Sequence, residues 1–182
     1  MKRVMMTCMG AAFALSLVLV AGVHAEKPAH AYAGTKTCKM CHSKETTGDQ
    51  FGIWEKSAHA QAYAVLGTDA AKAAAAKLGL EGNPQELGEC LSCHTTAYGV
   101  DAAQIGKRFS VEDGVQCEAC HGPGEDYKSM KIMKDPEAAK AHGLVVPTEE
   151  TCVACHNDKS PTFKGFDYAE AWKKIAHPNP AK

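Results

Sequence analysis

The residues with the clearest chemistry in this 182-residue sequence are pairs of cysteines separated by two residues, each pair followed directly by a histidine. This C-x-x-C-H pattern occurs four times, and it is the pattern that attaches c-type haem. The two thiols form thioethers to the vinyl groups of one porphyrin, and the histidine binds its iron. The sequence therefore predicts four covalently bound haem c groups. The attachment residues would be Cys38, Cys41, Cys90, Cys93, Cys117, Cys120, Cys152 and Cys155, and the proximal iron ligands would be His42, His94, His121 and His156.

Other uses of paired cysteines fit this pattern less well. A thioredoxin-like redox pair requires one C-x-x-C on a βαβ scaffold, and no alternating β pattern surrounds these motifs. Structural zinc uses two C-x-x-C pairs per ion, which gives no reason for a histidine after all four. The sequence has nine cysteines, of which Cys8 lies in the N-terminal segment. Many cysteines in an exported protein suggest disulfides, but the other eight all fall within the motifs.

The composition agrees with a cofactor-filled interior. The formal charge is −1, which argues against a nucleic-acid-binding protein. Aromatic residues make up only 7% of the chain, and much of its 45% hydrophobic content is alanine. Since the side chains alone would form a thin core, we expect the porphyrins to fill the interior and folding to depend on haem attachment.

The N-terminus has the organisation of a secretory signal peptide. Lys2 and Arg3 precede an apolar run from Met9 to about Val20, and small residues lead to a suitable cleavage site after Ala25. The run is shorter than the ~20 residues of a membrane span, which disfavours an uncleaved anchor. Residues 1–25 are predicted to be removed, although a second Ala-His-Ala ending at Ala31 leaves the cleavage site open. We expect a soluble periplasmic or extracellular protein without a transmembrane segment, with residues 26–182 forming a single tetrahaem domain.

The rest of the chain is predicted to be mostly α-helical with long irregular loops, a multihaem cytochrome c fold organised around four haems. Each motif should lie on a short helix or helical turn, and the closely spaced second and third motifs suggest neighbouring haems. Only residues 99–115 leave room for a small pair of strands. Further helices are expected over 54–66, over 69–77 after the cap Thr68, from Pro136 after the cap Asp135 to just before Gly143, and over 167–176.

The sixth iron ligand determines whether a haem serves only electron transfer or also binds small molecules. The candidate distal ligands are His59, His142, His177 and His30. Met130 and Met133 are alternative ligands that would raise the reduction potential, although packing is the favoured role for both. His59 is expected on a helix among small alanines, which would let a porphyrin face come close. For His30, in the N-terminal tail, ligation and a plain surface position are both open.

Several longer stretches carry a specific resemblance. They are Gly34–His42, Trp54–Ala60, Cys90–Gly99, Gly114–Gly124, Cys152–His156 and the terminal helix that ends at His177. In this order they resemble the cytochrome c-554 family of tetrahaem cytochromes. The resemblance implies a mostly helical fold with closely paired haems, three of them bis-histidine and the second five-coordinate. It also implies that His142 caps the first haem, His59 the third and His177 the fourth. The chain departs from the family in its shorter C-terminal part and in the additional His30.

The favoured function is electron transfer between redox protein donors and acceptors, because bis-histidine iron keeps its ligands in both oxidation states. One alternative is an enzyme that reduces a small ligand such as nitric oxide at the open haem of His94. Another is a subunit of a polymeric haem wire, in which His30 or His177 binds a neighbour's haem. The oligomeric state is open. Glu118 and Glu125, beside the third motif, are expected to be solvated surface residues, although contacts with propionates or a partner are also open.

Overall fold

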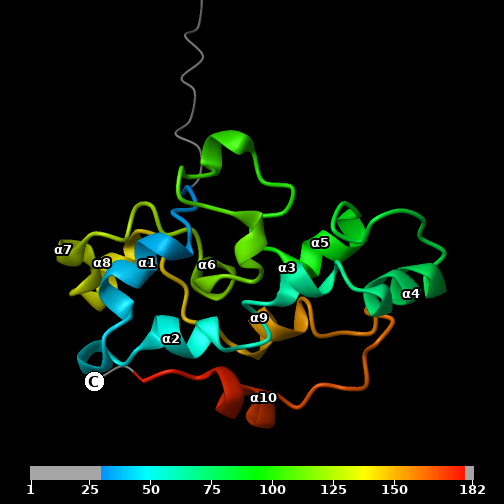
Figure 1. Cartoon of the computed structure of the whole chain (residues 1–182). Helices are drawn as coiled ribbons and strands as arrows, with labels where there is room; N and C mark the ends of the chain where they lie inside the picture. The colour runs from blue at the N-terminus through cyan, green and yellow to red at the C-terminus, as the bar shows by residue number, and fades with distance from the viewer. Residues whose placement is uncertain (1–29, 179–182) are drawn as a thin grey trace, which may run out of the picture.

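The computed structural model describes residues 30–178 (Figure 1). The predicted signal peptide and its cleavage site at Ala25 lie outside this range, whereas the alternative site at Ala31 lies within it. None of the helices between residues 30 and 178 has the length and apolar composition needed to span a bilayer.

The described chain is helical, as predicted. Its α-helices are α1 Thr35–His42, α2 Gln50–Glu55, α3 Ala62–Val65, α4 Asp69–Lys77, α5 Gly88–His94, α6 Cys117–His121, α7 Met130–Met133, α8 Pro136–Ala141, α9 Glu149–Val153 and α10 Tyr168–Ile175. Three 3-10 turns, η1 Glu45–Thr47, η2 Ala102–Gln104 and η3 Val111–Asp113, lie in the connections. Most of these elements are too short to be stable alone, so they depend on tertiary contacts.

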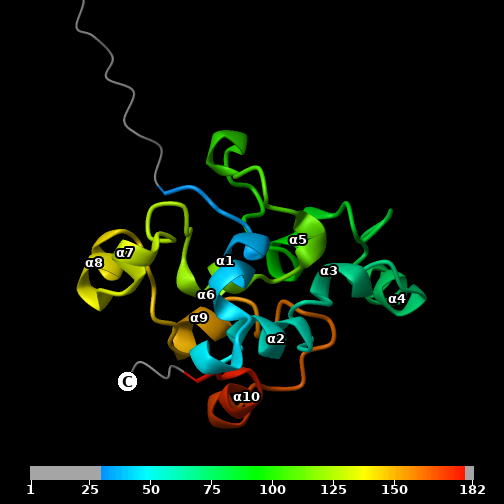
Figure 2. The ribbon, with the colours of Figure 1, turned by 60° about the vertical axis from the view of Figure 1, so that its left-hand side comes forward.

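The motif helices lie together in the middle of the molecule. Helix α1 packs against α2 and α6, and α3 packs against α5 and η3. Helices α7 and α8 pack on each other at one end, whereas α4 lies at the other end and α10 runs below the centre (Figures 1 and 2). Because α1, α5 and α6 each contain a complete C-x-x-C-H motif, this arrangement brings distant parts of the sequence to one central region.

The predicted helix ends with a clear capping residue are confirmed. The Thr68 hydroxyl accepts a hydrogen bond from the Ala71 N–H at the start of α4. Asp135 accepts from two N–H groups in the first turn of α8, and Asp167 accepts from the Glu170 N–H in α10. These local side-chain bonds satisfy N–H groups that have no partner within the helix, which is why the sequence identifies them reliably.

The helix predicted over 54–66 is wrong, because the chain forms two short helices separated by turns. Between α2 and α3 the backbone makes i→i+3 bonds, such as Ala62 N–H to the His59 carbonyl. The same His59 carbonyl accepts the Val115 N–H at 3.0 Å, which draws it away from a regular helix. His59 therefore lies in a turn, and not on a helix as predicted.

The strand pair suggested for 99–115 is also wrong. This segment contains the turns η2 and η3, and the β-type pairing within residues 30–178 is limited to one parallel bridge between Tyr32 and Ile105. In that bridge Tyr32 N–H donates to the Gln104 carbonyl, and Gly106 N–H donates to the Tyr32 carbonyl. The segment thus pairs with the chain that precedes α1 and does not fold back on itself.

Polar side chains form much of the buried interior. The buried apolar residues of the described chain are Ala33, Phe51, Leu66, Ala75, Tyr127 and Ala139, three of them alanines. Gln116 is 1% exposed and bridges two segments: its amide oxygen accepts the Thr35 N–H, and its amide nitrogen donates to the Ser110 carbonyl. Beside it, the Trp54 indole N–H donates to the Val115 carbonyl at 2.7 Å. The side chains alone form the thin core that the composition predicts.

Replacing Gly114 by alanine is expected to destabilise the holoprotein by roughly 2–4 kcal/mol. Gly114 has φ +69°, and a Cβ there would lie 2.6 Å from the His59 carbonyl oxygen, so the bond from Val115 N–H would be lost. Gly79→Ala is the matched control: its φ is +71°, but nothing lies within 4 Å of the added Cβ. The control should lose only about 1 kcal/mol. Equal losses in denaturant unfolding would contradict this account.

Candidate haem-binding site

Three of the four motif histidines are oriented by hydrogen bonds at one ring nitrogen. Nδ1 of His94 lies 2.7 Å from the Ala62 carbonyl oxygen, and Nδ1 of His121 lies 3.0 Å from that of Val145. Nδ1 of His42 lies 3.2 Å from the amide oxygen of Gln50. Since these oxygens only accept, each Nδ1 carries the proton, and Nε2 keeps a lone pair for a metal. This is the arrangement that orients histidine ligands in metal sites.

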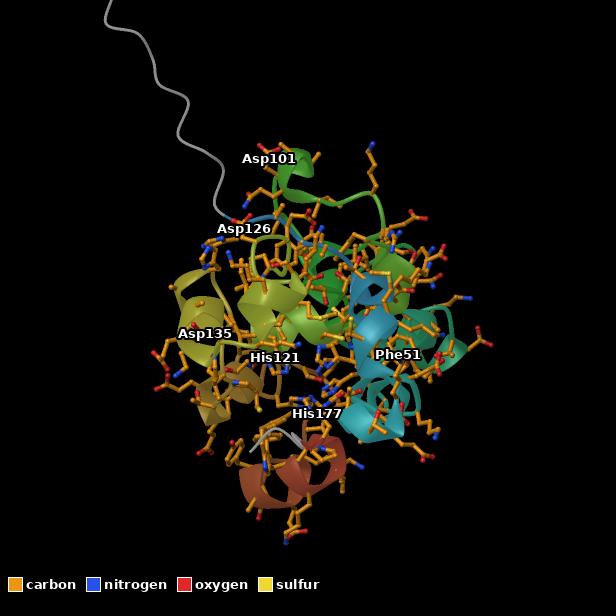
Figure 3. The ribbon with its side chains drawn as sticks, turned by 90° about the vertical axis from the view of Figure 1, so that its left-hand side faces the viewer. Phe51, Asp101, His121, Asp126, Asp135 and His177 are labelled. Carbon is orange, nitrogen blue, oxygen red and sulfur yellow. The ribbon has the colours of Figure 1, made fainter. Side chains whose placement is uncertain are left out.

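Two candidate distal histidines face two motif histidines. The rings of His59 and His156 have centroids 5.9 Å apart. Those of His121 and His177, which are labelled in Figure 3, have centroids 5.8 Å apart. Such separations suit two imidazoles that bind one metal from opposite sides through bonds of about 2 Å. In this structure His59 faces the histidine of the fourth motif and His177 that of the third, whereas the resemblance implies the third haem for His59 and the fourth for His177. The haem that each of them binds stays a prediction.

The physical reason for this pairing lies in the backbone. The turn that carries His59 is held by the residues just before the third motif, because the Val115 N–H donates to the His59 carbonyl. His177 directly follows α10, where Ala176 leaves the helix with an extended ψ of 136°. Neither connection is visible in local sequence pattern.

Burial favours the neutral form of three of these four histidines. It lowers the pKa of His59, His121 and His177 below the ordinary value, and like-charged neighbours lower it further. The neighbour is His156 for His59, His42 for His121, and His121 for His177. A neutral imidazole is the form that binds a metal, so the environment favours ligation.

The other candidate ligands have different surroundings. His142 ends α8, and its Nδ1 lies 2.8 Å from the Ala138 carbonyl oxygen, which leaves Nε2 available. His30 donates from Nδ1 to Asp126 at 2.7 Å, and its ring lies against Gly143. Within residues 30–178, no ring contact joins His94 to a second histidine.

The cysteines of different motifs lie close to each other. Hydrogen bonding to Cys117 raises the pKa of Cys38, and the same interaction lowers the pKa of Cys117 to about 7. Burial, with Cys93 as a neighbour, raises the pKa of Cys155 to about 11. In the described chain, thiol hydrogen bonds thus join Cys38 of the first motif to Cys117 of the third, and Cys93 of the second to Cys155 of the fourth. That the haems of the second and third motifs are neighbours stays a prediction.

A cavity lies beside Cys93 and Cys155. A cavity of about 290 Å³ is lined by residues of α5, of α6 and of the segment after the second motif, including Cys93, Cys155, Tyr98 and Val115. All eight cysteines of the described residues are free of disulfides. Oriented histidines, free thiols at the motif spacing and a thin core together fit covalently bound haem.

Some residues of the site were missed or misjudged from the sequence. Phe166 stacks on His156 with centroids 4.9 Å apart, and nothing near Phe166 in the sequence indicates this. Glu118 was expected at the surface and is 2% exposed, because its carboxylate accepts backbone N–H groups from distant segments. Glu125 is exposed and pairs with Lys128, as expected for a surface residue.

Comparison with known proteins finds similarity to one family. Residues 37–122 match the family described as cytochrome c554 and c-prime, a range that covers the first three motifs. The chain is 29% identical over 150 residues to cytochrome c-554 of Nitrosomonas europaea, which covers 74% of this chain and 61% of that protein. No solved structure matches the chain. The resemblance seen in the sequence is confirmed.

Replacing His59 or His177 by alanine is expected to convert one low-spin ferric iron to high spin, because each side chain faces a motif histidine. The double variant should convert two. Electron paramagnetic resonance of the oxidised protein measures this. Added imidazole is the control, since it should restore the low-spin signal in each variant. An unchanged spectrum in either single variant would contradict the pairing.

Proposed function

We propose that this chain, which belongs to the cytochrome c554 family, carries electrons between redox proteins. The observation that carries the proposal is the pair of facing histidine couples, His59 with His156 and His121 with His177. Haem, when bound, supplies an iron that changes between the ferrous and ferric states. Two fixed imidazoles hold that iron equally well in both states, so little rearrangement opposes the transfer of an electron.

The chain's own residues fix these imidazoles in place. The Val145 carbonyl orients His121, and stacking by Phe166 holds the His156 ring. His59 is held through its own backbone, because its carbonyl accepts the Val115 N–H. These contacts keep the ligands positioned without help from a mobile loop. We propose that the eight motif cysteines attach four haems and that the four motif histidines are the proximal ligands.

For the first site we propose His142 as the distal ligand. It keeps a free Nε2, and the facing couples already use His59 and His177. We assign His30 a supporting role, because it bonds Asp126 and its ring packs on Gly143, next to His142.

A second candidate function rests on His94. It is oriented by the Ala62 carbonyl, as His121 is by the Val145 carbonyl, but no second histidine ring faces it in the described residues. An iron held there would keep an open position that a small molecule such as nitric oxide could occupy. Electron transfer remains the favoured function, since this feature concerns one of four sites. A haem wire built from many chains finds no specific support in these contacts.

The N-terminal segment bears on export and processing. The Ala31 carbonyl accepts the Glu125 N–H, and His30 bonds Asp126. Cleavage after Ala31 would remove both contacts, so we infer export to the periplasm or beyond with cleavage after Ala25. N-terminal sequencing of the exported protein should then read from Glu26. A start at Tyr32 would contradict this inference.

The electron-carrier proposal predicts four reversible one-electron steps in spectroelectrochemistry, with the reduced protein binding a single equivalent of carbon monoxide at the open site. The protein should stay intact when a donor cytochrome reduces it and an acceptor reoxidises it. Sustained consumption of nitric oxide at a rate above the exchange of electrons with redox proteins would favour the enzyme instead. Irreversible reduction would contradict both.

A further inference from the structure

Glu118, between the two cysteines of the third motif, is a carboxylate buried among backbone N–H groups. One oxygen, Oε1, accepts the Ala33 N–H at 2.7 Å and the Gly124 N–H at 2.6 Å. The other, Oε2, accepts the Gly34 N–H at 2.8 Å. The side chain is 2% exposed. A single residue thus joins the segment before α1 to the loop after the third motif.

The donor set suits a carboxylate. All three partners are N–H donors, and a carboxylate accepts at both oxygens, whereas a protonated acid would turn one oxygen into a donor. Hydrogen bonds from several backbone N–H groups stabilise a buried carboxylate. Within the described residues no basic side chain forms a hydrogen bond or an ion pair with Glu118, so its charge is stabilised by backbone N–H dipoles and is not cancelled by a cation.

This charge lies beside the attachment points of two sites. Glu118 directly follows Cys117 of the third motif, and Cys38 of the first motif is a hydrogen-bonding neighbour of Cys117. Its negative charge also raises the pKa of Tyr127, together with burial. Tyr127 in turn donates from its hydroxyl to the carbonyls of His121 and Gly122. The charge is therefore close to both the first and the third motif.

We propose that Glu118 sets the reduction potentials of the first and third haem sites, holding both below the value they would have without it. Adding an electron to an iron is disfavoured by a nearby negative charge, and the effect is weakly screened where water is excluded. Net charge near the iron is one of the factors by which proteins tune haem potentials. Glu118 is a positioning residue as well, since it fixes the backbone on both sides of α6. The inference rests on the proposed binding of haem.

The test is the Glu118→Gln variant of the full chain, produced as holoprotein and titrated by spectroelectrochemistry. Two of the four midpoint potentials should rise, making those sites about tenfold easier to reduce, which is 59 mV for a one-electron step. The other two should stay within error of the parent protein. A merely structural role would lower the unfolding temperature without this selective shift.

The matched control is Glu125→Gln, which removes the same charge from the same region. Glu125 is 41% exposed and paired with Lys128, so solvent screens its charge and its loss should leave all four potentials unchanged. Equal shifts in both variants, or no shift in Glu118→Gln, would overturn the inference. Haem content measured on the same samples separates this result from failure of the proposed function, which would appear as chains without covalent haem.

Glu118→Asp covers the case in which the glutamine variant does not accumulate. Aspartate keeps the charge but shortens the reach, so stability should fall while the potentials stay close to those of the parent protein. Accumulation of the aspartate variant alone, with parental potentials, would support the need for the charge. A tenfold shift in the aspartate variant, whose charge is retained, would overturn the inference.

Discussion

The polar segment just before and within the third motif, residues 114–118, is the constraint on which the rest of the structure depends. Gln116 holds the start of α1, Val115 binds both the His59 carbonyl and the Trp54 indole, and Glu118 holds the chain before α1. Few apolar side chains are buried in the described chain, so these hydrogen bonds decide how the short helices are placed. Buried polar networks that are fully satisfied specify one arrangement well.

This framework explains how ligands distant in sequence come to share a site. The bond from Val115 to the His59 carbonyl places His59 opposite His156, and the end of α10 places His177 opposite His121. Each couple joins two separate parts of the chain. Metal binding across such a couple would stabilise the fold as well as create the redox centre, as in other small proteins whose folding is coupled to their metal.

Local chemistry was predictable from the sequence, and tertiary pairing was not. The caps Thr68 and Asp135 act within one turn, so their patterns identified α4 and α8. The C-x-x-C-H motifs are likewise recognisable from five consecutive residues. The interruption of the helix at His59 depends on a hydrogen bond from Val115. The burial of Glu118 depends on Ala33 and Gly34, which lie more than eighty residues before it in the sequence. The helix and surface predictions at these positions failed because their partners are remote.

The central claim is that covalent haem, and not apolar side chains, fills the interior between the motif helices. Intact-mass spectrometry of the purified exported protein tests it most directly. The account predicts the mass of the processed peptide plus four haem groups, retained under denaturing conditions because thioether bonds hold them. A mass equal to the bare peptide, in a protein that is nonetheless folded, would contradict the account.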